Sequence, residues 1–293
     1  MLTSTIKSIP HQTLVLIASY LLISQSQFTQ AQATPAQIVE VISKYDALNL
    51  SSEYPVGLGI PLKALALLNV NYPNGPVNLG QPYNKTDVST KPTISITPVV
   101  ATVENFESPN VFTLIMSDAN TLGNPDPQGG FRHYLQNGVT FGDLTPNNTL
   151  NINEGSGTVV TDYVGPGPSL NSGPHRYTWL LFIQPSGSFN PPSNLSAENT
   201  GKGHWDLKSY VNSSGLGDLV AASFFTVQNG TATFSSNGTN STSSGNGTST
   251  NTTSSAKSNA NHASFAPGQY VNSIDLMKTI FASAVVGISS LLV

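Results

Sequence analysis

Proline and glycine interrupt the chain about every ten residues between positions 34 and 234. The segments between them are short and rich in Val, Ile, Thr and Phe, residue types that suit a pleated and half-buried backbone. Segments of this length and composition are typical of strands, so we expect this span to fold as one domain dominated by β-structure. No internal repeat and no linker divides it.

Six segments have the length and composition of strands. They are Thr93–Ile96, Val111–Met116, Arg132–Asn137, Gly157–Tyr163, Tyr177–Gln184 and Ser223–Thr226. Two helices are also expected. Residues 35–45 place apolar side chains at helical spacing, with Thr34 as a cap and Pro35 in the first turn. Residues 205–212 repeat that spacing before a stop at Gly215.

The first residues have the composition of a secretory signal. Lys7 comes before an uncharged apolar run at residues 13–23, and the small residues Ala31 and Ala33 follow. The alternative is a membrane helix, but this run is well short of the roughly 20 residues that cross a bilayer. We therefore predict a signal peptide over residues 1–33, and a mature chain that begins near Thr34.

The last residues indicate attachment to a lipid. Residues 235–260 consist mainly of Ser, Thr, Asn and Gly, which cannot bury enough apolar surface to fold. Residues 261–293 provide a spacer and a short apolar tail, which is typical of a GPI-attachment signal. A tail anchor or a core helix is the alternative. We predict a secreted glycoprotein at the cell surface, GPI-anchored to the plasma membrane or cell wall.

Glycosylation sequons support the secretory route. They lie at Asn49, Asn84, Asn147, Asn194, Asn212, Asn229, Asn237, Asn240, Asn246 and Asn251. The chain has no cysteine, so the domain must be held together by burial of its core without disulfides. Its net charge is −4, which disfavours nucleic acid as a partner.

A few polar residues lie at the ends of predicted strands: Asp118, His133, His175 and Arg176. Three such strands could meet at one end of a sheet and form a small pocket, in which two imidazoles and loop amides would suit an anion. The alternative is that each side chain makes an ordinary structural hydrogen bond. Histidine spacing does not match a metal motif, and Ser156 lacks the Gly-X-Ser-X-Gly turn of a hydrolase.

Residues 163–184 read YVGPGPSLNSGPHRYTWLLFIQ and resemble the signature of the phosphatidylethanolamine-binding protein (PEBP) family. In that family a Gly/Pro-rich loop precedes Gly-X-His-Arg-Tyr and an apolar strand. The segments FTLIMSDAN (112–120), RHYL (132–135) and 205–225 are similar to other family segments. The resemblance covers about residues 36–228 and is closest to secreted fungal members with a GPI-type tail.

The resemblance implies a mainly β fold with peripheral helices, in which a large antiparallel sheet packs on a smaller one. It also implies a pocket for phosphate or a phospholipid headgroup. The positions that match the family's pocket are Asp118, His133, Gly167, Pro168, His175 and Tyr177. Arg176 matches an arginine that we expect to be structural, bound to an acid or to loop carbonyls beneath the site.

Four positions depart from the family pattern. Asn120 replaces a second aspartate, Ala119 and Leu122 replace prolines, and Ser169 replaces a loop proline. Without a carboxylate at position 120, the pocket would repel a phosphate less and hold an ammonium group less firmly. The change at Asn120 therefore counts against specificity for ethanolamine.

The leading hypothesis is a non-enzymatic surface protein that binds a small anion or phospholipid headgroup, without a cofactor or metal. An inhibitor of a serine carboxypeptidase is the alternative, acting through a protein interface. A structural surface glycoprotein with a vestigial pocket is a third hypothesis.

Overall fold

The structure is a computed structural model that describes residues 32–122, 130–153, 155–186, 189–198 and 202–231. These residues belong to the first of two compact units, Met1–Thr233. The predicted stalk and GPI signal lie outside the described residues, as does nearly all of the predicted signal peptide. The sequons at Asn237, Asn240, Asn246 and Asn251 also lie outside them. The structure does not test the predicted domain boundaries, which therefore stay predictions.

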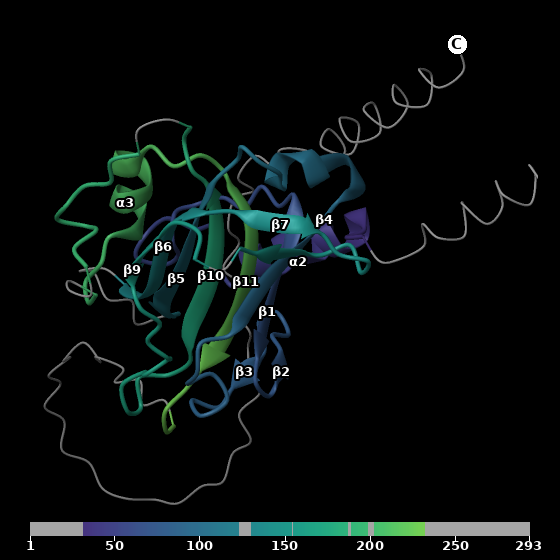
Figure 1. Cartoon of the computed structure of the whole chain (residues 1–293). Helices are drawn as coiled ribbons and strands as arrows, with labels where there is room; N and C mark the ends of the chain where they lie inside the picture. Colours follow the sequence, from purple (N-terminus) through teal and green to yellow (C-terminus); the bar gives the residue numbers. More distant parts are fainter. Residues whose placement is uncertain (1–31, 123–129, 154, 187–188, 199–201, 232–293) are drawn as a thin grey trace, which may run out of the picture. The chain divides into compact units, whose positions relative to one another are not determined.

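Two sheets form the domain (Figure 1). The larger has the order β3 (Pro82–Tyr83), β11 (Leu219–Val227), β10 (His175–Ile183), β5 (Phe112–Thr121), β6 (Phe131–Val139), β9 (Thr158–Thr161). The smaller has the order β2 (Gly75–Pro76), β1 (Ala66–Tyr72), β4 (Thr93–Pro98), β8 (Leu150–Ile152), β7 (Phe141–Leu144). Neighbouring strands are antiparallel except for the pair β3 and β11. The predicted fold class is therefore confirmed.

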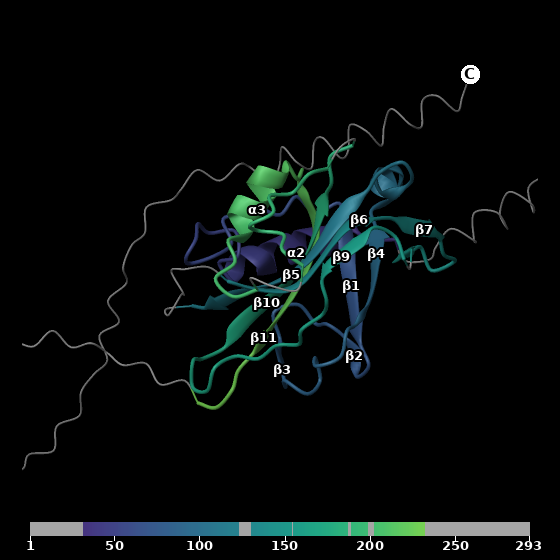
Figure 2. The ribbon, with the colours of Figure 1, turned by 60° about the vertical axis from the view of Figure 1, so that its left-hand side comes forward.

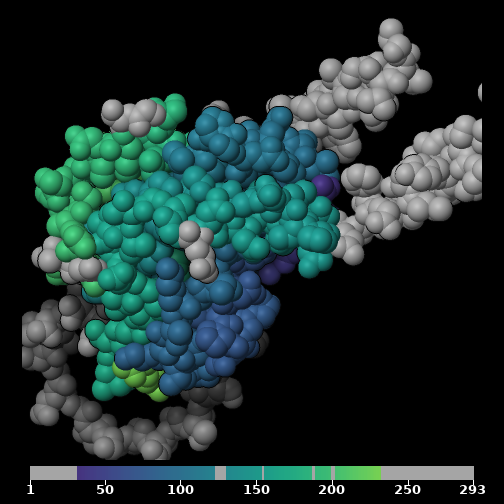
Figure 3. All heavy atoms as spheres, in the orientation of Figure 1, coloured from purple at the N-terminus to yellow at the C-terminus, as the bar shows by residue number. Residues whose placement is uncertain are grey.

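Each face of the large sheet packs on a different layer. One face meets the small sheet, and Met116 and Trp179 share that core with Leu68 of β1. The other face meets the helices α2 (Pro35–Ala47) and α3 (Leu207–Ser214), where Leu180 packs near Tyr210. Figure 2 shows α3 and the strands β1 and β2 on opposite sides of β10. Figure 3 shows the same view with all atoms as spheres, in which green segments lie at the upper left and blue segments lie at the top and lower right.

The central strands are buried on both faces, which explains their sequence pattern. In β10, the seven residues between His175 and Ile183 are all buried, and β5 and β11 are almost as enclosed. A strand that is covered on both faces has no solvent side and therefore reads as a continuous apolar run. This pattern made the segments around β5, β10 and β11 recognisable as strands in the sequence.

Both predicted helices are confirmed. At the start of α2, the Gln37 amide donates to Thr34 Oγ1 over 3.2 Å, and the Thr34 amide donates to Gln37 Oε1 over 2.8 Å. This reciprocal capping box satisfies two amides that the helix leaves without partners. Asp206 caps α3 by accepting from the Ser209 amide over 2.8 Å, and α3 ends at Gly215 with φ of 65°.

The structure also differs from the prediction in several elements. Strand β5 does not end near Asp118 but continues to Thr121, and Asn120 has a left-handed φ of 58° there. Strand β9 is shorter than predicted. The prediction did not include β1, β2, β3, β7, β8 or the 3-10 helix η1 (Val100–Phe106). Among the described residues, no helix has the length and apolar composition needed to cross a membrane.

Candidate functional site

One end of the large sheet brings together the residues singled out in the sequence. Strands β10, β5 and β6 are neighbours, and Asp118 pairs with Tyr177 on one side and with Phe131 on the other. Because β5 runs antiparallel to both neighbours, its last residues lie beside the first residues of β6 and β10. This register places Asp118, His133, His175 and Tyr177 at the same end of the sheet. Their role in binding stays a prediction.

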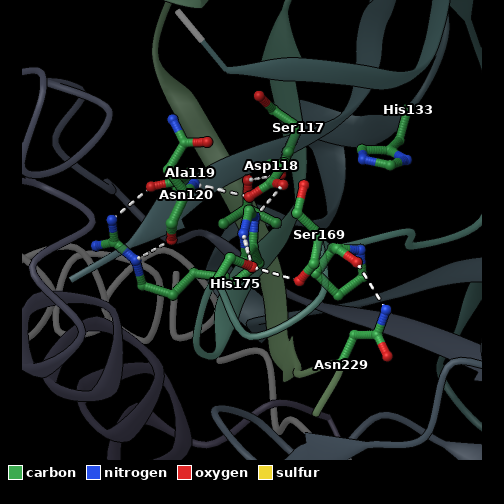
Figure 4. A network of polar contacts seen from close by, with 12 residues as sticks. Ser117, Asp118, Ala119, Asn120, His133, Ser169, His175 and Asn229 are labelled. Carbon is green, nitrogen blue, oxygen red and sulfur yellow. Dashed lines mark hydrogen bonds and ion pairs between the residues drawn. The ribbon is translucent and has the colours of Figure 1, made fainter. Parts of the chain in front are cut away.

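Asp118 is the centre of the polar contacts in this cluster (Figure 4). Its Oδ2 lies 2.7 Å from His175 Nδ1, and its Oδ1 accepts from the Asn120 amide over 2.7 Å. The side chains of Asp118 and His175 are only 8% and 15% exposed. A carboxylate and an imidazole at this distance form a strong hydrogen bond, and the pair is nearly enclosed.

The hydrogen bonds of His175 indicate which of its ring nitrogens carry a proton. The hydroxyl of Ser172 donates to the Ser169 carbonyl over 2.7 Å, and Ser172 Oγ lies 3.0 Å from His175 Nε2. A hydroxyl has one proton, so Ser172 accepts from Nε2. The carboxylate of Asp118 accepts from Nδ1. In this arrangement both ring nitrogens donate, and we infer from these contacts that the His175 ring is an imidazolium paired with the Asp118 carboxylate.

Tyr177 connects this pair to the Gly/Pro-rich loop. Burial raises the pKa of its hydroxyl far above the ordinary value, the negative charge of Asp118 raises it further, and the hydroxyl stays protonated. It hydrogen-bonds both to the Asp118 side chain and to the Gly167 backbone. Gly167 is exposed, whereas Pro168 is buried and its carbonyl accepts from Asn229 Nδ2 over 3.3 Å.

His133 lies to one side of the ion pair (Figure 4). It is 4% exposed, and its ring meets the edge of the Tyr177 ring at 5.1 Å between centroids. Its Nδ1 donates to the Val164 carbonyl over 2.6 Å. Burial lowers the pKa of His133, and the Val164 hydrogen bond and Asp118 only partly oppose this effect. His133 is therefore a neutral imidazole whose Nε2 can accept a hydrogen bond.

Arg176 lies on the opposite face of β10, beneath the ion pair. Its guanidinium donates to the carbonyls of Leu48, Val56, Ala119 and Asn120. Of the two expected types of partner, an acid or loop carbonyls, the structure shows the carbonyls. Burial lowers the pKa of Arg176 to about 10, with Asp118 acting in the other direction. The side chain joins the chain after α2 to the last residues of β5.

A cavity of about 190 Å³ lies next to the cluster and has a different lining. Asp118 and Asn120 contribute to it together with residues of the segment after α2 and the start of α3, such as Leu58, Trp205 and Leu207. His133, Gly167, Pro168, His175 and Tyr177 do not line it. The cavity thus belongs to the helix side of the sheet, and Figure 4 shows the Asn120 side chain pointing away from the ion pair.

Two contacts of the site were absent from the sequence prediction. Ser172 holds His175 Nε2, and Asn229 holds the loop through Pro168. Ser172 lies three residues before His175 in a turn, so this spacing in the sequence could have predicted that the two side chains are close. Asn229 follows β11 and gave none, because its partner is a backbone carbonyl. Within the described residues, no group of three His, Asp or Glu side chains is arranged to hold a metal ion.

Comparisons with known proteins place these features in context. The family model described as phosphatidylethanolamine-binding protein matches residues 72–235, which is more than half of the chain. An uncharacterized protein of Saccharomyces cerevisiae is 28% identical over 182 residues, which cover 60% of this chain and 88% of that protein. The carboxypeptidase Y inhibitor of the same yeast is 28% identical over 135 residues, which cover 40% of this chain and 58% of the inhibitor.

A solved structure has a similar fold. It is the crystal structure of carboxypeptidase Y inhibitor complexed with the cognate proteinase, with a TM-score of 0.52 and 21% sequence identity. The alignment covers 66% of this chain and 96% of that one. At this identity the likeness concerns the fold.

Proposed function

Because this chain belongs to the phosphatidylethanolamine-binding protein family, we propose that it is a non-enzymatic protein that binds a zwitterionic headgroup of the phosphoethanolamine type. The observation that carries this proposal is the ion pair of Asp118 and His175, with 2.7 Å between Oδ2 and Nδ1. A headgroup of this type has a phosphate for the imidazolium and an ammonium for the carboxylate. The pair therefore provides one partner for each charge of the ligand.

Charge balance favours a zwitterion over a simple anion. An enclosed ion pair is costly to break when one charge is left without a partner. A simple anion that binds on the Nε2 side of His175 brings a second negative charge close to the Asp118 carboxylate, and no positive charge offsets it. A zwitterion brings an ammonium for the Asp118 carboxylate together with its phosphate, so it is the ligand class that this site accepts at the lowest cost.

Neighbouring groups support the same ligand class. The Nε2 of His133 is available as an acceptor for an ammonium proton, since its Nδ1 is held by the Val164 carbonyl. Burial and the charge of Asp118 raise the pKa of the Tyr177 hydroxyl, so it stays protonated beside the carboxylate and can donate a hydrogen bond. Gly167, in the loop above, is exposed and has nothing within 4 Å of an added Cβ, so there is room on that side.

Calorimetric titration of the purified protein tests this proposal. We expect O-phosphoethanolamine to bind more tightly than inorganic phosphate or ethanolamine. Asp118→Asn should remove most of the preference for O-phosphoethanolamine over phosphate, because the ammonium loses its partner. Asp143→Asn is the matched control, since Asp143 is an exposed carboxylate on β7 in the other sheet, and it should leave all three affinities unchanged.

Two results would contradict the proposal. One is the absence of saturable binding of O-phosphoethanolamine at millimolar concentration. The other is equal affinity for phosphate and O-phosphoethanolamine, which would indicate a plain anion site instead.

Inhibition of a serine carboxypeptidase is a second candidate function. It is favoured by the 28% identity to the yeast carboxypeptidase Y inhibitor, which extends over 58% of that inhibitor. A purified serine carboxypeptidase mixed with micromolar protein should then lose activity stoichiometrically. Unchanged peptidase activity under those conditions would exclude this candidate. Repeating the assay with Asp118→Asn separates the two functions, since an effect through a protein interface alone does not require the ion pair.

A further inference from the structure

Ser172 occupies an unusual place in the site. Its hydroxyl lies 3.0 Å from His175 Nε2, on the side of the ring that faces away from Asp118. The same hydroxyl donates to the Ser169 carbonyl over 2.7 Å, and the Ser172 amide donates to that carbonyl over 3.3 Å. The hydroxyl oxygen is thus presented to the imidazolium as an acceptor.

The loop around Ser172 is fixed by backbone contacts. Asn171 has a left-handed φ of 62°, and its amide donates to the Asn229 carbonyl over 2.7 Å. In return, Asn229 Nδ2 donates to the Pro168 carbonyl over 3.3 Å. These contacts hold the turn of Ser169 to Ser172 against the end of β11. The Ser172 hydroxyl can then leave His175 by rotation about one side-chain bond, without movement of the loop.

Both N–H groups of His175 are occupied when no ligand is bound. Nδ1 donates to Asp118 over 2.7 Å, and Nε2 donates to Ser172. A phosphate oxygen that binds Nε2 has to take the position of the Ser172 hydroxyl. A charged phosphate oxygen is a stronger acceptor than a neutral hydroxyl, so it wins this exchange, whereas a neutral ligand oxygen gains nothing from it.

We propose that the Ser172 hydroxyl is a placeholder for a phosphate oxygen at His175 Nε2 and leaves that position when the headgroup binds. This inference rests on the headgroup-binding function proposed above. It makes Ser172 a specificity-determining residue, because only ligands with a charged acceptor displace it. In the unliganded protein the same contact keeps the imidazolium satisfied.

Variants at two neighbouring serines test the placeholder. We expect Ser172→Ala to bind O-phosphoethanolamine about three- to tenfold more tightly than the wild type, which is the range for removal of one competing neutral hydrogen bond. Ser172→Thr retains a hydroxyl and should keep the wild-type affinity. Ser169→Ala is the matched control, since the carbonyl of Ser169 and not its side chain holds Ser172.

An NMR measurement without ligand checks the contact itself. The ¹⁵N resonance of His175 Nε2 should shift in Ser172→Ala and stay in place in Ser169→Ala. An unshifted Nε2 resonance, or an alanine variant that binds O-phosphoethanolamine as tightly as the wild type or less tightly, overturns the placeholder while leaving headgroup binding intact. If neither the wild type nor Ser172→Ala binds O-phosphoethanolamine, the headgroup function and the placeholder both fail.

Discussion

His175 and Arg176 are adjacent in the sequence, but their side chains leave opposite faces of β10. The His175 ring meets Asp118, whereas the Arg176 guanidinium meets four carbonyls on the helix side, two of them from Leu48 and Val56. Alternation along a strand turns one dipeptide into two separate groups. The His175 side chain carries the charge of the site, and the Arg176 side chain ties the end of β5 to the segment after α2.

This arrangement predicts that Arg176 is required for stability. Arg176 is 1% exposed, and a lysine in its place keeps the charge but cannot reach four carbonyls with one ammonium group. Because buried acceptors would be left without partners, we expect Arg176→Lys to lower the free energy of unfolding by about 3 kcal/mol. Urea denaturation measures this change. Lys44→Arg, at a partly exposed position, is the control and should stay within about 0.5 kcal/mol, and an equally small loss for Arg176→Lys would contradict the prediction.

His133 predicts a pH dependence of stability. Burial lowers its pKa in the folded protein below the ordinary value of 6.5, so the unfolded chain binds the proton more tightly. Its contribution is therefore fully present above pH about 6.5 and is lost as the pH falls toward the lower pKa of the folded state. His133→Asn should flatten the thermal-unfolding profile between pH 7 and pH 5 relative to the wild type. A profile for His133→Asn that stays parallel to that of the wild type would argue against this assignment.

At the scale of elements, the strands that are buried on both faces could be predicted from the sequence. Several strands whose position depends on pairing with neighbouring strands were not predicted. The segments of β5, β10 and β11 are continuous apolar runs, which no solvent-exposed element would tolerate. Strand β1 alternates buried and partly buried residues over ALLNVNY, and this period of two was available in the sequence but was not used. Strands β2 and β3 have two residues each, too few to produce a period.

The candidate site was predictable to a similar extent. Asp118, His175 and Tyr177 could be placed together because the end of one strand lies beside the start of its antiparallel neighbour, at the same end of the sheet. The four carbonyl partners of Arg176 were beyond prediction, because a backbone oxygen is the same in every residue and only the fold selects it. Asn120 also lines the cavity on the helix side, and this position could not be predicted from the sequence for a related reason.

The same difference between central and edge strands predicts the pattern of hydrogen exchange. Strand β10 pairs with β5 and β11 and is buried on both faces, so its amides should exchange only through global unfolding. Among the described residues, strand β9 pairs only with β6, and two of its four residues are exposed, so its amides should exchange through local opening. Exchange followed by mass spectrometry should separate the two strands by orders of magnitude in rate. Similar protection in both would contradict this order.

At the scale of the whole molecule, the sequons of the described domain lie where a glycan has access. Asn84, Asn147, Asn194, Asn212 and Asn229 are exposed, and Asn49 is partly exposed. Nδ2 of Asn229 also donates to the Pro168 carbonyl. A glycan on that nitrogen replaces one of its two protons and leaves the other for the loop. Glycosylation and the loop contact are therefore compatible, although the sugar would lie next to the site.

We propose that the chain is displayed at the cell surface by a GPI anchor, with the binding domain carried on the Ser/Thr-rich stalk. Residues 235–260 are mainly Ser, Thr, Asn and Gly, and a spacer and an apolar run follow them, which is the order of parts in a GPI-attachment signal. In yeast cells that express the full chain, phosphatidylinositol-specific phospholipase C should release the protein, and a glycosidase should lower its apparent mass. Deletion of residues 261–293 should send it to the medium without enzyme treatment. Retention of that shortened chain in the cell, or resistance of the full chain to the phospholipase, would show that the tail does not act as an attachment signal.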